Sequence, residues 1–213
     1  MRKVFTKMLE REVSQGGYPA KKARASKKWL QQKAREAKSR TLTNSKVRNQ
    51  NPNILARQLQ TPRSLKNRIM VGNMYIFIYD PKLKNELEHY DTFPLVIPIK
   101  DYSDGFLGIN LHYLDPMDRA ILMDALYDNV SDNNYDENTK LLLKYETMSK
   151  ASKYKYFRPC LKRYLTIHAR TRFIKIESAE WDNVLFLPTE RFVKSNRRQV
   201  WSESTRKVVT NAI

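Results

Sequence analysis

The chain is poor in cysteine and glycine, and each shortage excludes a class of protein. Cys160 is the one cysteine, so no intrachain disulfide can form, and a reducing compartment or indifference to redox state is expected. Only five glycines occur in 213 residues. No P-loop, dinucleotide-binding glycine pattern, zinc-ligand spacing or nucleophile elbow is present. We therefore expect no enzyme, no catalytic residue, no cofactor and no metal.

Long apolar runs are missing as well. No stretch approaches the roughly 18 apolar residues that a membrane-spanning helix needs. The N-terminus lacks the apolar segment of a secretory signal. We expect a soluble protein that is intracellular when it is made.

Positive charge is what the chain has in excess, with a formal net charge of +18 at pH 7. Residues 1–70 hold 19 Lys and Arg against 3 Asp and Glu, residues 71–148 hold 6 against 14, and residues 149–213 hold 15 against 5. Two basic segments therefore flank an acidic middle. The position of this charge is more informative than its total.

Residues 1–70 are predicted to form a basic arm rather than a compact fold, because their large apolar residues are few and scattered. Short helices are expected after Pro19 and after Pro52. Cations on every side of the first helix would repel one another, so this helix should need phosphates or an acidic surface as a partner. The cations that we predict to bind nucleic acid here are Lys21, Lys22, Arg24, Lys27, Lys28, Lys33, Arg35, Lys38 and Arg40.

This charge predicts that the arm binds nucleic acid or another polyanion. Each Lys or Arg that pairs with a phosphate releases a counterion, which favours binding. Aromatic residues are scarce in the arm, so it should follow the phosphate backbone rather than stack on bases. The alternative is a solvated tail that only improves solubility, which is the usual role of a charge run.

The composition changes near Val71, and residues 71–213 are predicted to form a compact α+β domain. Runs rich in β-branched and aromatic residues predict strands at 74–79, 95–99, 106–113, 173–176 and 184–187. Pro98 indicates an edge position or a bulge in the second strand. Asp104-Gly105 predicts the turn of a hairpin with a connection of about five or six residues.

Helices are predicted between these strands. Asp115-Pro116 supplies an N-cap and a first helical residue. Met117, Ile121 and Ala125 form the expected buried stripe, with Leu122 and Leu126 as further candidates for it. Further helices are expected at 141–145, from Pro159 onward with Leu161, Tyr164, Leu165 and His168 on one face, and in the basic tail after Phe192. The predicted fold is a small barrel-like antiparallel sheet with a helical insertion, closed by pairing of its first and last strands.

A second basic patch interleaves cations with aromatic residues. Such a pattern could grip a sugar-phosphate backbone or stack on an exposed base at a duplex end. It could equally belong to an amphipathic helix whose aromatic residues lie in the core and whose cations face water. From this patch we predict nucleic-acid contacts by Lys153, Lys155, Arg158, Lys162, Arg163, Arg170 and Arg172.

The acidic middle does not indicate a catalytic centre. Residues 132–137 resemble a calcium-binding loop but lack its central glycine and its terminal spacing. A solvated face, or a surface that pairs with the basic segments, is the favoured interpretation. His112 is expected to be structural or at the surface, and Cys160 is expected to be a packed thiol.

Four segments carry a resemblance to a known family: Gly72–Lys82, Tyr90–Val96, Gly105–Leu114 and Phe157–Leu165. They resemble the DNA end protector proteins of T-even-type tailed phages and their relatives in cyanophages. The resemblance covers roughly residues 71–192 and not the arm. Its segments form the fold rather than a catalytic signature, so it assigns no functional residue.

The resemblance implies a virion protein that is added at head completion. Such a protein would bind the end of the packaged double-stranded DNA and shield it from host exonuclease. Its neighbours would be phage portal, neck or tail proteins, and it would occupy the host cytoplasm during assembly.

Two other hypotheses stay open. In one, the chain is a structural neck or baseplate protein whose basic arm docks onto acidic partner subunits. The anchors would then be the scattered apolar residues Phe5, Leu9, Trp29, Leu30, Ile54 and Leu59. A metal-dependent nuclease is disfavoured, because the acidic residues fall on different helical faces and on a loop.

Overall fold

A computed structural model describes residues 3–14, 25–26, 28–29, 31–32, 35, 69–130, 155–176, 180–185 and 190–210. The described residues between 25 and 35 are helical, as predicted for the segment after Pro19. The helices predicted after Pro52 and at 141–145 lie outside the described residues.

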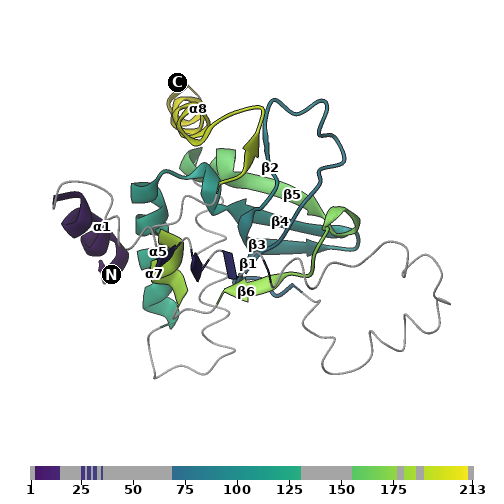
Figure 1. Ribbon diagram of the computed structural model, residues 1–213. Helices are drawn as coiled ribbons and strands as arrows, with labels where there is room; N and C mark the ends of the chain where they lie inside the picture. The colour runs from purple at the N-terminus through teal and green to yellow at the C-terminus, as the bar shows by residue number, and fades with distance from the viewer. Residues whose placement is uncertain are drawn as a thin grey trace, which may run out of the picture.

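The centre of the molecule is a five-stranded antiparallel sheet in the order β5-β4-β3-β1-β6 (Figure 1). Its strands are β1 Met74–Ile76, β3 Leu95–Tyr102, β4 Gly105–Asn110, β5 Leu161–Leu165 and β6 Ile174–Ile176. Helix α5 (Pro116–Val130) is inserted between β4 and β5, as the sequence predicted. The mixed helix and antiparallel-sheet class is also as predicted. The predicted barrel closure is wrong, because β5 and β6 form two separate edges within the described residues.

The β3–β4 hairpin organises the sheet. Ile97 pairs with Ile109, and Tyr102 pairs with Gly105, so the connection is shorter than the sequence predicted. The register shifts between Pro98 and Lys100, which confirms the bulge expected at a proline that cannot donate a ladder hydrogen bond. The alternative of an edge position is wrong, because β3 lies between β4 and β1.

Two predicted elements adopt another secondary structure. A helix was expected from Pro159, but Lys155–Cys160 forms a 3-10 helix and the chain continues as β5, in which Tyr164 pairs with Phe106. The helical spacing of apolar residues was overridden by pairing with β4. The described part of the strand predicted at 184–187 instead belongs to helix α7 (Trp181–Leu185). The strand predicted at 173–176 is confirmed as β6.

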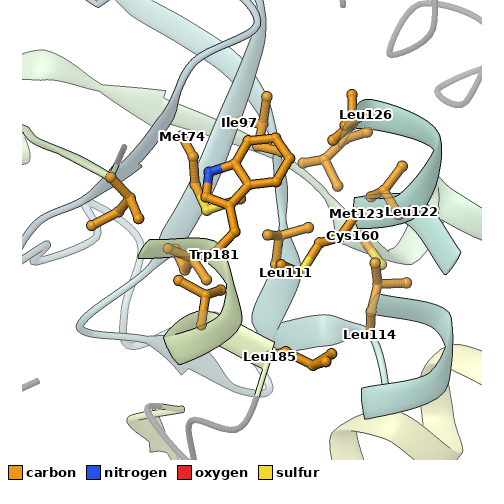
Figure 2. Packing of buried hydrophobic residues seen from close by; sticks show 14 of the residues in the cluster. Met74, Ile97, Leu111, Leu114, Leu122, Met123, Leu126, Cys160, Trp181 and Leu185 are labelled. Carbon is orange, nitrogen blue, oxygen red and sulfur yellow. The ribbon is translucent and has the colours of Figure 1, made fainter. Parts of the chain in front are cut away.

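Helices α1 (Val4–Ser14), α5 and α7 cover one face of the sheet and form the main core with it (Figures 1 and 2). Asp115 caps α5 as predicted, accepting from the backbone N–H groups of Met117 and Asp118. The predicted buried stripe is wrong for Met117 and Ile121, which are 38% and 44% exposed. It is confirmed for Leu122 and Leu126, and the helix also buries Ala120 and Met123, since both the sheet and α1 pack against it.

Helix α1 was not predicted, and it belongs to the core. Phe5 and Leu9, one turn apart, are each 3% exposed. Asp124 of α5 holds the start of the helix: its Oδ1 accepts from Phe5 N at 2.7 Å, and its Oδ2 accepts from Thr6 N at 3.0 Å. Asp124 therefore caps a helix from another element. At Asp124 the acidic middle is not a solvated face, and the other interpretation, a surface that pairs with the basic segments, agrees with this contact to residues 1–70. The beginning of the predicted arm is part of the packed molecule, while the boundary at residue 70 stays a prediction.

The C-terminal segment covers another side of the molecule. Strand β7 (Phe192–Val193) pairs with β2 (Tyr90–Asp91), and helix α8 (Arg197–Thr210) follows, in agreement with the predicted helical tail. Val200 of α8 is buried in the main core, and Trp201 Nε1 donates to the carbonyl of His112 at 2.9 Å. No helix within the described ranges is long and apolar enough to span a bilayer.

Candidate nucleic-acid interface

The sheet face opposite the helices carries a layer of aromatic side chains. Phe77 is fully buried, and its ring meets those of Tyr79, Phe106, Tyr164 and Phe173 edge-on. Phe106 of β4 and Tyr164 of β5 stack with centroids 5.2 Å apart. These contacts attach β5 to the sheet, so Tyr164 belongs to the core. The core role offered for the aromatic residues of the second basic patch is confirmed for Tyr164, although on a strand rather than a helix.

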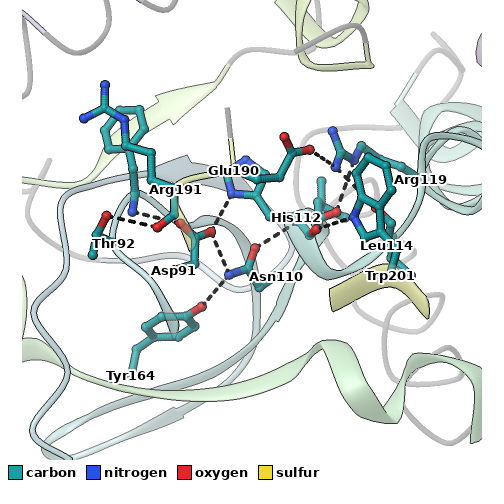
Figure 3. A network of polar contacts seen from close by, with 12 residues as sticks. Asp91, Thr92, Asn110, His112, Leu114, Arg119, Tyr164, Glu190, Arg191 and Trp201 are labelled. Atoms are coloured by element: carbon teal, nitrogen blue, oxygen red, sulfur yellow. Dashed lines mark hydrogen bonds and ion pairs between the residues drawn. The ribbon is translucent and has the colours of Figure 1, made fainter. Parts of the chain in front are cut away.

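A buried polar network adjoins this aromatic layer (Figure 3). Asp91 Oδ2 lies 2.5 Å from His112 Nδ1 and accepts from Asn110 Nδ2 at 3.2 Å, while its Oδ1 accepts from Phe93 N at 3.0 Å. Burial alone would raise the pKa of Asp91, but the charge and hydrogen bond of His112 hold this pKa below its ordinary value. His112 is 0% exposed and structural, as predicted.

Arg119 and Glu190 form a second buried ion pair beside this network. Arg119 Nη2 lies 2.7 Å from Glu190 Oε1, and Arg119 Nε donates to the carbonyl of Leu111 at 3.1 Å. Arg119 is 1% exposed. No sequence pattern singles out Arg119, Glu190 or Asp91, because nothing in their spacing indicates partners that are distant in the chain.

A cavity of about 380 Å³ opens between β5 and the connection from Tyr79 to Asp91. Its lining is mostly apolar and aromatic, with Leu83, Leu87, Tyr90, Tyr113 and Leu161 among the residues that form it. Leu83 and Leu87 are 49% and 38% exposed. Asp91, Asn110 and Tyr164 of the buried network also line it. The cavity is large enough for a small ligand.

Lys162 of β5 lines this cavity as a half-buried cation. Its Nζ lies 4.1 Å from the centroid of the Tyr113 ring, a cation–π contact. No carboxylate within ion-pair distance of Lys162 Nζ is found among the described residues. Burial lowers the pKa of Lys162 to about 8. A lysine in such surroundings gains from an anionic ligand that compensates its charge.

The connection that covers the cavity is fastened by Lys194. Its Nζ donates to the carbonyls of Lys84, Asn85 and Leu87, each at 3.0 Å. Lys194 has a φ of 67°, which is unfavourable for a side chain of this kind and is offset by these three hydrogen bonds. Lys194 therefore holds the connection from Tyr79 to Asp91 in place at residues 84–87.

The predicted cations of the second patch have different surroundings. Arg163 also lines the cavity, pairs with Asp104 and stacks over Tyr102. Arg170 pairs with Asp80 at 2.5 Å. Arg158 and Arg172 are exposed, whereas the side chain of Lys155 and all of Lys153 lie outside the described residues. The structure thus brings Lys162 and Arg163 together at one cavity, whereas Arg158, Arg170 and Arg172 are not among its lining residues.

Most predicted cations of the arm lie outside the described residues. These are Lys21, Lys22, Arg24, Lys27, Lys33, Lys38 and Arg40. Lys28 and Arg35 are described, helical and exposed. Their role in binding stays a prediction. The cavity residues Tyr90 and Tyr113 were missed, because their spacing in the sequence does not reveal that they share a cavity with Lys162.

Two further groups near the cavity bear on chemistry. Burial raises the pKa of the Cys160 thiol to about 12, so this thiol is packed and unreactive, as predicted. Glu88, His89 and Glu203 place three ligand-type atoms within 4.8 Å of one another. Within that group His89 Nδ1 lies 3.6 Å from Glu203 Oε2, and Lys207 pairs with Glu88 at 3.8 Å. Burial lowers the pKa of His89 despite the nearby Glu203. The lowered pKa makes His89 a neutral neighbour of Glu203, and Glu88 of the same group pairs with Lys207.

A family model described as Phage T4 terminal DNA protecting protein matches residues 26–211. The match spans the sheet, the cavity and α8. This chain belongs to the family of phage terminal DNA protecting proteins. The family match starts well inside the basic segment, which corrects the expectation that the likeness is confined to residues 71–192. No curated protein and no solved structure matched the chain.

Proposed function

We propose that this protein binds the end of the packaged double-stranded DNA of a phage and protects it from host exonuclease, without catalysing a reaction. The observation that carries the proposal is the match of residues 26–211 to a terminal DNA protecting family. The net charge of +18 supports it, since phosphate neutralisation supplies most of the affinity of proteins that do not read base sequence.

The cations proposed to contact DNA are those of the arm together with Lys162, Arg163, Arg170 and Arg172 around β5. The arm would follow the phosphate backbone, and the compact part would meet the duplex end. Addition at head completion, a place in the virion beside portal, neck or tail proteins, and assembly in the host cytoplasm belong to the same proposal. They agree with a phage family whose members protect DNA termini.

The alternative of a purely structural neck or baseplate protein is less well supported. It needs the apolar residues of the arm as anchors for partner subunits. Phe5 and Leu9 are instead buried in the chain's own core. Trp29 packs against the same core, and its Nε1 donates to Glu180 Oε1 at 3.0 Å. Leu30, Ile54 and Leu59 lie outside the described residues.

The proposal is tested with the full-length protein and DNA of one sequence in linear and covalently closed circular form. We expect the linear form to be protected from a processive exonuclease. Closed circles should compete poorly for the protein. Total affinity should fall steeply with salt, with a log–log slope on the order of several released ions. Equal binding to both forms, together with an unprotected linear form, would contradict the proposal.

The contribution of the arm needs a substitution rather than a deletion. Removing residues 1–50 would also remove α1 from the core, so loss of binding would not report on charge. We propose changing Lys21, Lys22, Lys27 and Lys28 together to Gln in the full chain. This variant should bind both DNA forms more weakly and show a shallower salt dependence. An unchanged salt dependence would exclude these cations from the DNA interface.

A further inference from the structure

The cavity beside β5 combines features that suit one end of a nucleic acid strand. It has a cation at one wall, in Lys162, and an apolar and aromatic lining elsewhere. A phosphate suits such a cation, and a base suits such a lining. Its volume of about 380 Å³ is near the lower end of the range for ligand pockets. There is room for a single nucleotide and not for a stacked base pair.

We infer that this cavity receives the terminal nucleotide of the DNA end, with a phosphate at Lys162 and the base against the apolar lining. The inference rests on the proposed function and names the ligand of one site within it. It assigns a role to Tyr90, Tyr113, Leu83 and Leu87, which no sequence motif singles out.

The mouth of the cavity supports this occupant. Leu83 and Leu87 line the cavity and remain 49% and 38% exposed, so apolar surface is available to an incoming base. Arg163 lies at the same cavity and can meet the next phosphate along the strand. The connection that carries both leucines is held by the three hydrogen bonds of Lys194. The site is therefore formed before the nucleotide enters.

The physics of a DNA end explains why a terminal nucleotide would enter and an internal one would not. An internal nucleotide is stacked on both sides and must break both stacks to leave the duplex. A terminal nucleotide has one stacking neighbour, so extruding it is easier. A closed circle offers no such nucleotide. An exonuclease begins at the terminus, so a nucleotide held in this cavity is withheld from the enzyme.

Lys162→Met in the full-length protein is the main test. Methionine is unbranched and only one atom shorter than lysine, and it removes the half-buried charge, so folding should be preserved. The quantity measured is the ratio of affinities for linear and closed circular DNA of one sequence. We expect this ratio to fall about tenfold, while affinity for the circle changes little. Arg172→Met is the matched control: it removes one exposed cation and should weaken both forms equally.

A second variant does not depend on any buried group. Leu87→Glu places a carboxylate at the mouth of the cavity, where it repels a phosphate. Ile121→Glu is its control, because Ile121 is 44% exposed on α5, away from the cavity lining. We expect Leu87→Glu to lose the preference for linear DNA and exonuclease protection, and Ile121→Glu to keep both. If Lys162→Met failed to fold, this pair would carry the test.

The phosphate at Lys162 could be the terminal 5′-phosphate or the first internucleotide phosphate. Blunt duplexes that carry either a 5′-phosphate or a 5′-hydroxyl distinguish these two. Tighter binding of the 5′-phosphate form, lost in Lys162→Met, supports the inference with the terminal phosphate at Lys162. Equal binding of the two forms, weakened together by Lys162→Met, supports it with the first internucleotide phosphate there. A photoactivatable 4-thiothymidine at the terminal position should crosslink to peptides within 79–91 or 161–165.

Failure of the cavity inference and failure of the proposed function give different experimental results. If the wild type prefers linear DNA and both cavity variants retain that preference, the cavity inference is overturned and the proposed function stands. If the wild type shows no preference for linear DNA and no protection, the proposed function fails and the inference fails with it.

Discussion

The two faces of the central sheet are covered by different kinds of side chain. On the helical face, α1, α5 and α7 pack apolar side chains such as Met123, Leu126 and Trp181 against the strands (Figure 2). On the opposite face, the aromatic layer adjoins the Asp91–His112 pair and a cavity that contains Lys162.

This difference separates stability from function. Each apolar side chain that the helical face buries adds to the free energy of unfolding. Buried charges are retained against a desolvation penalty, and such groups cluster where a protein binds or reacts. The helical face therefore supplies most of the stability, and the cavity face is where a ligand is expected.

The largest effect is expected at Asp91. In Asp91→Asn, one carboxylate oxygen becomes an NH2 donor, so the amide cannot accept from Phe93 N as well as from His112 Nδ1 and Asn110 Nδ2, and the buried carboxylate charge beside His112 is lost. We expect the free energy of unfolding to fall by about 3–5 kcal/mol, measured by urea denaturation at pH 7. Asp101→Asn, at an exposed position of β3, should change it by less than about 0.5 kcal/mol. A small loss at Asp91 would mean that the network adds little to stability.

The same residue predicts a dependence on acid. The pKa of Asp91 is lower in the folded protein than its ordinary value of 3.8. Its stabilising contribution is therefore complete above the unfolded pKa and is lost as the pH falls through the folded pKa. The difference in stability between wild type and Asp91→Asn should shrink below pH 3.8. A difference that stays constant into stronger acid would show that Asp91 is not the titrating group.

An effect of intermediate size is expected on the helical face at Asp124. Asp124→Ala leaves the N–H groups of Phe5 and Thr6 and the Thr6 hydroxyl without their acceptor. We expect a loss of about 2–3 kcal/mol and faster amide exchange within α1. The preference for linear DNA should be kept wherever the variant is folded, because the cavity lies on the other face. A loss of that preference in the folded variant would break the division between the faces.

Replacing Lys162 should stabilise the protein, whereas replacing Asp91 or Asp124 should destabilise it. Its pKa is about 8 in the folded protein against 10.5 for a free lysine. Between these values the unfolded chain binds more protons, so the wild type should gain stability as the pH rises from 8 to about 10. Lys162→Met lacks this gain and should be more stable than the wild type at pH 7 by about 1–3 kcal/mol. Parallel stability curves for the two proteins across that range would argue against a buried, charged Lys162.

The smallest effect is expected at Lys194. Lys194→Met removes three hydrogen bonds to the connection over the cavity, but the side chain is exposed. Global stability should fall by less than about 1 kcal/mol. Amide exchange of residues 82–88 should accelerate, and binding of DNA ends should weaken more than binding of circles. Unchanged exchange in this segment would show that another contact fixes the connection.

Local sequence signals predicted several elements correctly. The Asp115-Pro116 cap, the β3–β4 hairpin, the bulge at Pro98 and strand β6 follow from rules that involve neighbouring residues only. The family was also recognisable from the sequence. The errors have a common cause in long-range packing. The segment 161–165 is a strand because β4 is available to pair with it. The buried face of α5 differs from the predicted one at Met117 and Ile121, because α1 and the sheet both pack against this helix.

Some features of the candidate site could also be predicted from the sequence, and others depended on long-range packing. The sequence identified Lys162 and Arg163 as cations among aromatic residues, and this follows from composition alone. It could not show that Lys162 is half-buried over Tyr113, that Leu87 and Tyr90 line the same cavity, or that Asp91 pairs with His112. These partners are tens of residues apart in the chain, and they meet only through strand pairing.

By itself, the sequence determined the charge of this protein, its class of fold and its family, because these depend on which residues are present and on short-range patterns. The tertiary structure alone decided which charges are buried, which acids cap a helix, and where a cavity remains. The physical reason is that burial and pairing are properties of residues brought together by the fold. A lysine in water and a lysine over an aromatic ring are written with the same letter.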